Sequence, residues 1–91
     1  MMSRIEKKIT ISANESLHAR PASLFVQKAV KYNSSIWIKK GKEVVNGKSI
    51  IELLSLGIEK GTEITLIAEG DDAEEALQEL EELLMFYEKK N

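Results

Sequence analysis

The spacing of hydrophobic residues changes repeatedly along this 91-residue chain, and this limits the fold more than any other feature. Near the N-terminus Ile5, Ile9 and Ile11 alternate with polar residues, the pattern of a strand with one buried face. From Ala19 the period becomes helical, and we expect this helix to end near residues 32–34. Its apolar stripe comprises Ala22, Phe25, Val26, Ala29 and Val30.

The rest of the chain continues to alternate between strand and helix patterns. Ile36 and Ile38 predict a second strand over 34–40, and a turn around Gly41 leads to a third strand over 43–45. A capping box formed by Ser49 and Glu52 predicts a short helix that Gly57 or Gly61 would stop, followed by a strand over 62–69. Gly70, Asp71 and Asp72 then break the chain and cap a last helix from Ala73, with a stripe of Ala76, Leu77, Leu80, Leu83, Leu84 and Tyr87.

This order of elements predicts a single α+β domain spanning residues 1–91. Each strand has one apolar face and each helix one apolar stripe, so the economical packing is one antiparallel sheet with all helices on one side. A chain of this length can bury one modest core.

Composition narrows the class of protein. There is no cysteine, and no apolar run approaches the roughly 20 residues that span a bilayer, so we expect a cytoplasmic protein without membrane insertion. Residues 1–48 hold ten Lys and Arg against three Asp and Glu, whereas residues 49–91 hold three against twelve. The basic half would therefore attract an acidic partner.

The segment ESLHARPASLF, residues 15–25, contains the chain's one histidine and one proline. If the helix begins near Ala19, His18 is its N-cap and Pro21 lies in the first turn, where its missing N–H costs nothing. The free N–H groups of the helix start and the Arg20 guanidinium favour a phosphate anion, and the same field keeps the imidazole neutral and nucleophilic. An ordinary polar cap is the alternative, and the residues alone do not decide between the two.

Two stretches resemble the HPr family, the histidine-containing phosphocarriers of the bacterial phosphoenolpyruvate–sugar phosphotransferase system. LHARPASLFVQKA resembles the family's active-site motif, and VNGKSIIELLSLGIEKGTEITLIAEG resembles the motif around its regulatory serine. The resemblance implies an open-faced β-sandwich, in which three helices cover one face of a four-stranded antiparallel sheet. It also implies a carrier rather than an independent catalyst, and we expect a monomer with no cofactor and no bound metal.

The same resemblance assigns roles to individual residues. It implies that His18 accepts a phosphoryl group on Nδ1 from phosphorylated enzyme I and donates it to sugar-specific enzyme IIA domains. Arg20 matches the family's active-site arginine and, with Ser16 and Ala19, is expected to hold the phosphate. Ser16 stands where the family usually has glycine, and its hydroxyl is a further hydrogen-bond donor.

Ser49 matches the serine that HPr kinase/phosphorylase modifies in many Gram-positive members, whose modified form binds the regulator CcpA. Glu52 stands where those members often have a small residue. It supports the helix while Ser49 is unmodified but would repel a phosphate on Ser49.

A docking patch for protein partners is also implied, comprising Ile50, Ile51, Leu54, Lys28 and Lys48. Core packing is the alternative for its three apolar members. Because a short helix buries only part of its apolar surface, we expect Leu53 and Leu56 in the core and the other three exposed.

Other functions fit the sequence less well than a carrier. A Crh-like catabolite-repression regulator acting mainly through Ser49 is the main alternative, but such paralogues lack the histidine that this chain keeps at His18. A nucleic-acid binder is disfavoured by the acidic total and the lack of an aromatic pair placed for base stacking. One histidine without a carboxylate at motif spacing does not predict a hydrolase.

Overall fold

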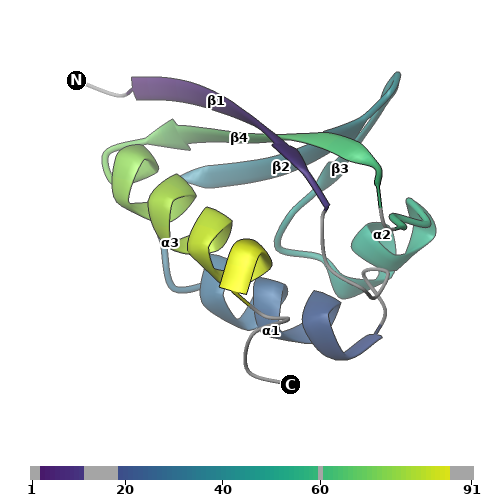
Figure 1. Cartoon of the computed structure of the whole chain (residues 1–91). Helices are drawn as coiled ribbons and strands as arrows, with labels where there is room; N and C mark the ends of the chain where they lie inside the picture. The colour runs from purple at the N-terminus through teal and green to yellow at the C-terminus, as the bar shows by residue number, and fades with distance from the viewer. Residues whose placement is uncertain (1–2, 12–18, 60, 87–91) are drawn as a thin grey trace.

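The predicted order of strands and helices is present in the computed structural model, which describes residues 3–11, 19–59 and 61–86. Its elements are β1 (Ser3–Thr10), α1 (Ala19–Ala29), β2 (Ser35–Lys40), β3 (Glu43–Asn46), α2 (Ile50–Ser55), β4 (Glu63–Gly70) and α3 (Ala73–Phe86). All three helices lie on the same side of the sheet (Figure 1). The α+β open-faced sandwich is therefore confirmed.

The four strands form one antiparallel sheet in the order β1-β4-β2-β3. β1 pairs with β4 along its whole length, from Ser3 opposite Gly70 to Thr10 opposite Glu63. Hairpin β2–β3 turns at Gly41, whose φ of 60° lies in the left-handed region that glycine adopts without steric cost. This order leaves β4 and β2 in the centre, flanked on both sides by hydrogen-bonded neighbours.

The core lies between the central strands and the helices. Ile36 is opposite Ala68 and Ile38 opposite Leu66, so their side chains form one continuous apolar layer. The helices and the C-cap of α2 cover it with residues that are at most 8% exposed: Ala22, Phe25, Ala29, Leu53, Leu56, Ala73, Ala76, Leu77, Leu80 and Leu84. Burying a large apolar side chain contributes roughly 1.5–3 kcal/mol, so this layer is the main source of stability.

The opposite face of the sheet has no helix on it (Figure 1). Trp37 lies on this face, as its alternation with Ile36 and Ile38 predicts, and it is half-buried. The Arg4 guanidinium lies 5.9 Å from the centre of the Trp37 ring, within cation–π range. The Arg4 side chain therefore partly shields the indole on the solvent-facing side of the sheet.

Helix α1 ends earlier than predicted, at Ala29. The N–H groups of Lys31 and Tyr32 bond to the carbonyls of Lys28 and Ala29, three residues back rather than four. This tightening of the last turn ends the regular helix, and Val30 is 55% exposed. The prediction that Val30 belongs to the buried stripe was therefore wrong.

Asp72 holds the loop between α1 and β2. Its backbone carbonyl accepts the N–H of Ala76 and so begins α3, as predicted for a cap. Its carboxylate instead reaches back along the chain and accepts the N–H groups of Asn33 and Ser34, each at 2.9 Å, and the Ser34 hydroxyl. Gly70 approaches Ser34 so closely that an added Cβ would clash with the side chain and backbone of Ser34. This junction fixes where α1 ends relative to α3.

These hydrogen bonds, above all that from the Ser34 hydroxyl, hold the pKa of Asp72 below its ordinary value of 3.8. A depressed folded pKa contributes stability at higher pH that is lost as pH falls through it. We expect Asp72→Asn to lower the urea midpoint at pH 7, and the difference from the parent protein to shrink below pH 3.8. Asp71→Asn, at the exposed neighbouring position, is the control. The same pH dependence in both variants would contradict this assignment.

Candidate functional site

The region around the predicted phosphoryl acceptor is only partly within the described residues. Ser16 and His18 lie outside them. Helix α1 begins at Ala19, as predicted, so Pro21 is in the first turn. That turn contains no acidic residue, so none of its own side chains offsets the partial positive charge of the helix start. The side chain of Arg20 is also outside the described part, and the phosphate-binding roles assigned here stay predictions.

Ser49 is the N-cap of α2. Its backbone is extended, with φ −117° and ψ 114°, and its hydroxyl oxygen accepts the N–H of Glu52 at 3.3 Å. This bond satisfies one of the N–H groups that have no partner inside the helix. The hydroxyl of Ser49 therefore stabilises the helix start before any modification. The residue is half-buried.

The capping box predicted from Ser49 and Glu52 forms only in one direction. The Glu52 carboxylate does not return to the N–H of Ser49; it accepts the N–H of Asn46 at 3.0 Å. The N–H of Ser49 bonds instead to the carbonyl of Asn46 at 3.2 Å. The reason is the tight turn from β3 into α2, which brings Asn46 back over the helix start.

Removing the cap tests this geometry. We expect Ser49→Ala to lower the free energy of unfolding by about 1 kcal/mol, because the Glu52 N–H loses its acceptor. Urea denaturation measures the change. Ser49→Thr, which keeps a hydroxyl acceptor, is expected to recover most of the loss. If the alanine and threonine variants were equally stable, the cap would contribute nothing.

The exposed face of α2 matches most of the expected docking patch. Leu53 and Leu56 are 1% and 3% exposed, as predicted, while Ile51 and Leu54 are 78% and 42% exposed. Ile50 was expected on the surface, but it is half-buried and packs against the core. The reason is its position at the first residue of a helix that packs against α1 and β3. Whether this face binds a partner stays a prediction.

The two lysines expected beside this patch already have partners inside the protein. The Lys48 ammonium donates to the backbone carbonyl of Tyr32 at 2.7 Å. Lys28 lies 3.5 Å from a carboxylate oxygen of Glu79, which also accepts the Tyr32 hydroxyl. The Tyr32 hydrogen bond, with a smaller effect of Lys28, lowers the pKa of Glu79. Both lysines therefore connect elements of the fold as well as adding charge to its surface.

Lys40 holds the other end of α2, a contact that sequence patterns did not predict. Its ammonium donates to the carbonyls of Leu56 and Gly57 at 2.9 and 3.1 Å. Cations are favoured at helix C-termini, where carbonyls have no helical partner. No local spacing reveals the contact, since Lys40 is on β2 and lies 16 residues from Leu56. α2 is thus held at both ends by side chains.

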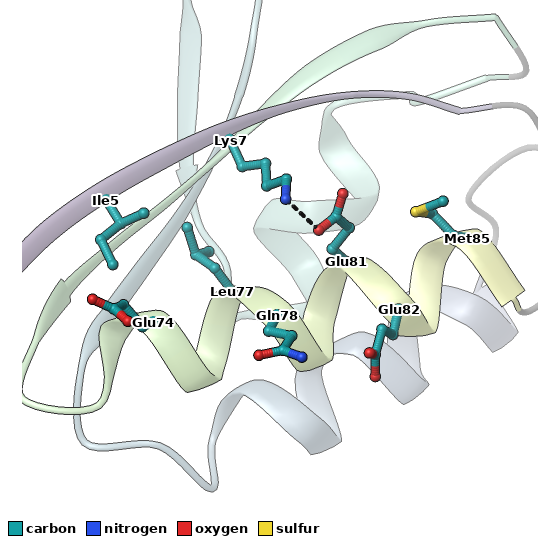
Figure 2. Close-up of a pocket in the computed structure, with 8 residues that line it drawn as sticks. All are labelled: Ile5, Lys7, Glu74, Leu77, Gln78, Glu81, Glu82 and Met85. Carbon is teal, nitrogen blue, oxygen red and sulfur yellow. Dashed lines mark ion pairs between the residues drawn. The ribbon is translucent and has the colours of Figure 1, made fainter.

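A groove of about 490 Å³ lies between β1 and α3 (Figure 2). Apolar atoms of Ile5, Leu77 and Met85 contribute to its lining, and Lys7 forms a 2.9 Å ion pair with Glu81 across it. This ion pair explains why β1 has a charged residue, Lys7, on the face that it turns toward the helices. The other charged residues of its wall are acidic, so the groove is unfavourable for a phosphate, and no residue of the predicted site lines it.

Neither a metal cluster nor a membrane span is found in the described part of the chain. No three or more His, Cys, Asp or Glu side chains come together there as metal ligands would. None of the helices described has the length and apolar character needed to cross a membrane.

Known proteins of similar sequence and structure combine this fold with these motifs. The family model for the PTS HPr component phosphorylation site matches residues 5–85. The HPr-like protein Crh of Bacillus subtilis is 45% identical over 76 residues, covering 84% of this chain and 89% of the relative. The phosphocarrier protein HPr of Borreliella burgdorferi is 42% identical over 80 residues, covering 88% and 93%. A crystal structure of HPr from Thermoanaerobacter tengcongensis has a TM-score of 0.89 at 45% identity, covering 96% and 98%. The chain belongs to the HPr family of phosphocarrier proteins.

Proposed function

We propose that the protein is a phosphoryl carrier of the sugar phosphotransferase system, with His18 as the acceptor. The neutral imidazole attacks phosphorus, so that the bond from Nδ1 to phosphorus forms while the bond to the donor, phosphorylated enzyme I, breaks. Attack by an enzyme IIA domain then transfers the group onward. Arg20, Ser16 and the backbone at Ala19 stabilise the phosphate while it is carried.

The observation that carries this proposal is a histidine directly before α1, in a chain that matches the family's phosphorylation-site model from residue 5 to 85. The first N–H groups of a helix have no partner inside the helix, and the first turn of α1 contains no acidic residue. These groups favour the product, a dianionic phosphate, over the unmodified state. The reaction needs no cofactor or metal held by the protein.

A Crh-like regulator acting mainly through Ser49 is the second candidate. The 45% identity to Crh of Bacillus subtilis favours it, as does a half-buried serine at the N-cap of α2. Its partners would be HPr kinase/phosphorylase and a regulator of the CcpA type. Retention of His18 favours the carrier, and both activities can exist in one protein. The swapped dimer solved for Crh of Bacillus subtilis contrasts with the monomer that we expect for a cytoplasmic carrier.

Phosphorylation of His18 is the direct test. Incubation with phosphoenolpyruvate and enzyme I is expected to add one acid-labile phosphate, because a phosphorus–nitrogen bond hydrolyses readily in acid. Intact-protein mass spectrometry before and after acid treatment measures it. His18→Ala is expected to abolish the label and Ser49→Ala to retain it. Labelling that survives His18→Ala would exclude this histidine as the acceptor.

The exposed face of α2 provides a second prediction. Ile51→Ser removes apolar surface that is 78% exposed, so we expect stability to change by no more than about 0.5 kcal/mol. The second-order rate of phosphoryl transfer from enzyme I is expected to fall several-fold, since the docking contact is lost. Val44→Ser, at a 52% exposed position on β3, is the matched control. Equal transfer rates in both variants would exclude Ile51 from the docking surface.

A further inference from the structure

The turn between β3 and α2 brings Ser49 and the acidic residue Glu52 together at one helix start. Ser49 accepts the backbone N–H of Glu52 at 3.3 Å, while the Glu52 carboxylate folds back to accept the N–H of Asn46 at 3.0 Å. β3 is an edge strand of the sheet, and among the described residues no further strand lies beyond it to satisfy that N–H. Glu52 therefore contacts both the N-cap, through its backbone N–H, and the edge of the sheet, through its carboxylate.

We propose that Glu52 restrains phosphorylation of Ser49 and that a phosphate on Ser49 in turn releases Glu52 from Asn46. This inference rests on the proposed regulatory use of Ser49. In the modification, the bond from the Ser49 oxygen to the γ-phosphorus of ATP forms, the bond from that phosphorus to ADP breaks, and the hydroxyl proton leaves. The product adds a charge near −2 on a residue only three positions before Glu52, at the start of the same helix.

The nearest cation on the turn is already engaged. Lys48 is the residue before Ser49, but its ammonium donates to the carbonyl of Tyr32 at 2.7 Å, and its backbone N–H donates to the Asn46 side chain at 2.9 Å. Neutralising a phosphate with Lys48 would cost the contact with Tyr32. The carboxylate of Glu52 can instead move toward solvent, because this residue is exposed. Movement of Glu52 away from Asn46 is therefore the easier response.

Two opposing effects act on the added charge. The partial positive charge of a helix start favours a phosphate, whereas Glu52, three residues along the same turn, repels it. α2 has only six residues, so the helix effect is small. Glu52 thus determines how readily the turn accepts negative charge.

A double-mutant cycle isolates the charge of Glu52 without any kinase. Glu52→Gln keeps an oxygen acceptor for the Asn46 N–H but removes the charge, and Ser49→Asp keeps an N-cap acceptor but adds one. Ser49→Asp is made in two backgrounds, the parent protein and the Glu52→Gln variant, and its effect on the equilibrium constant for unfolding is compared. We expect the increase in that constant to be about fivefold larger in the parent protein, where the Glu52 charge is present. Urea denaturation at low salt measures this coupling, and 1 M salt should largely remove it. Glu82→Gln, an exposed change on α3, is the control and should show no coupling.

Hydrogen exchange of one amide reports release of the carboxylate. Ser49→Asp is expected to speed exchange of the Asn46 N–H several-fold when Glu52 is present, and to have little effect in the Glu52→Gln variant.

With HPr kinase/phosphorylase and ATP, Glu52→Gln should incorporate acid-stable phosphate several-fold faster than the parent protein, and Ser49→Ala should incorporate none.

The different results separate this inference from the proposed function. Additive effects of Ser49→Asp and Glu52→Gln, or equal kinase rates with and without the Glu52 charge, would overturn the inference. Coupling together with a faster kinase rate would support it. Coupling with no acid-stable phosphate in any variant would support only the repulsion between Glu52 and a negative charge at residue 49, and it would overturn the regulatory use of Ser49.

Discussion

Burial of one face of the central strands β4 and β2 is the constraint on which the rest of the structure depends. Ile36, Ile38, Ile64 and Leu66 are at most 1% exposed, and they lie on one face only because each strand alternates. Three amphipathic helices must then cover that face, which leaves the other face of the sheet open. The starts of α1 and α2, and with the latter Ser49, consequently belong to the helical layer.

Polar contacts between distant parts of the chain then set where each helix begins and ends. The Asp72 carboxylate bonds to backbone 38 and 39 residues earlier and fixes the loop after α1. Lys40 holds the last carbonyls of α2, and Lys48 connects the turn before α2 to the end of α1. Each contact satisfies backbone groups that helix ends and loops leave without a partner, so each position has a physical reason. The turn that contains Ser49 is therefore connected by hydrogen bonds to α2 and to the segment that follows α1.

Much of this could be predicted because hydrophobic period is a local property. The alternation of Ile36 and Ile38 predicted the inner face of β2, and the change of period predicted the start of α1 at Ala19. The burial of Leu53 and exposure of Ile51 followed from the limited area that a short helix can cover. Val30 was placed wrongly because the period continues past Ala29, whereas the last turn tightens.

The sequence by itself determined the type and order of the elements and the motifs that identify the family. The reason is that hydrophobic period, helix-capping residues and motif spacing all depend on residues that are close together in the sequence. Only the tertiary structure decided the partners of Asp72, Lys48 and Glu52. Each of these polar side chains has several backbone groups within reach in the unfolded chain, and the choice among them depends on which elements the buried sheet face brings together. For Glu52 that choice is the N–H of Asn46 rather than that of Ser49, because the turn from β3 brings Asn46 over the start of α2.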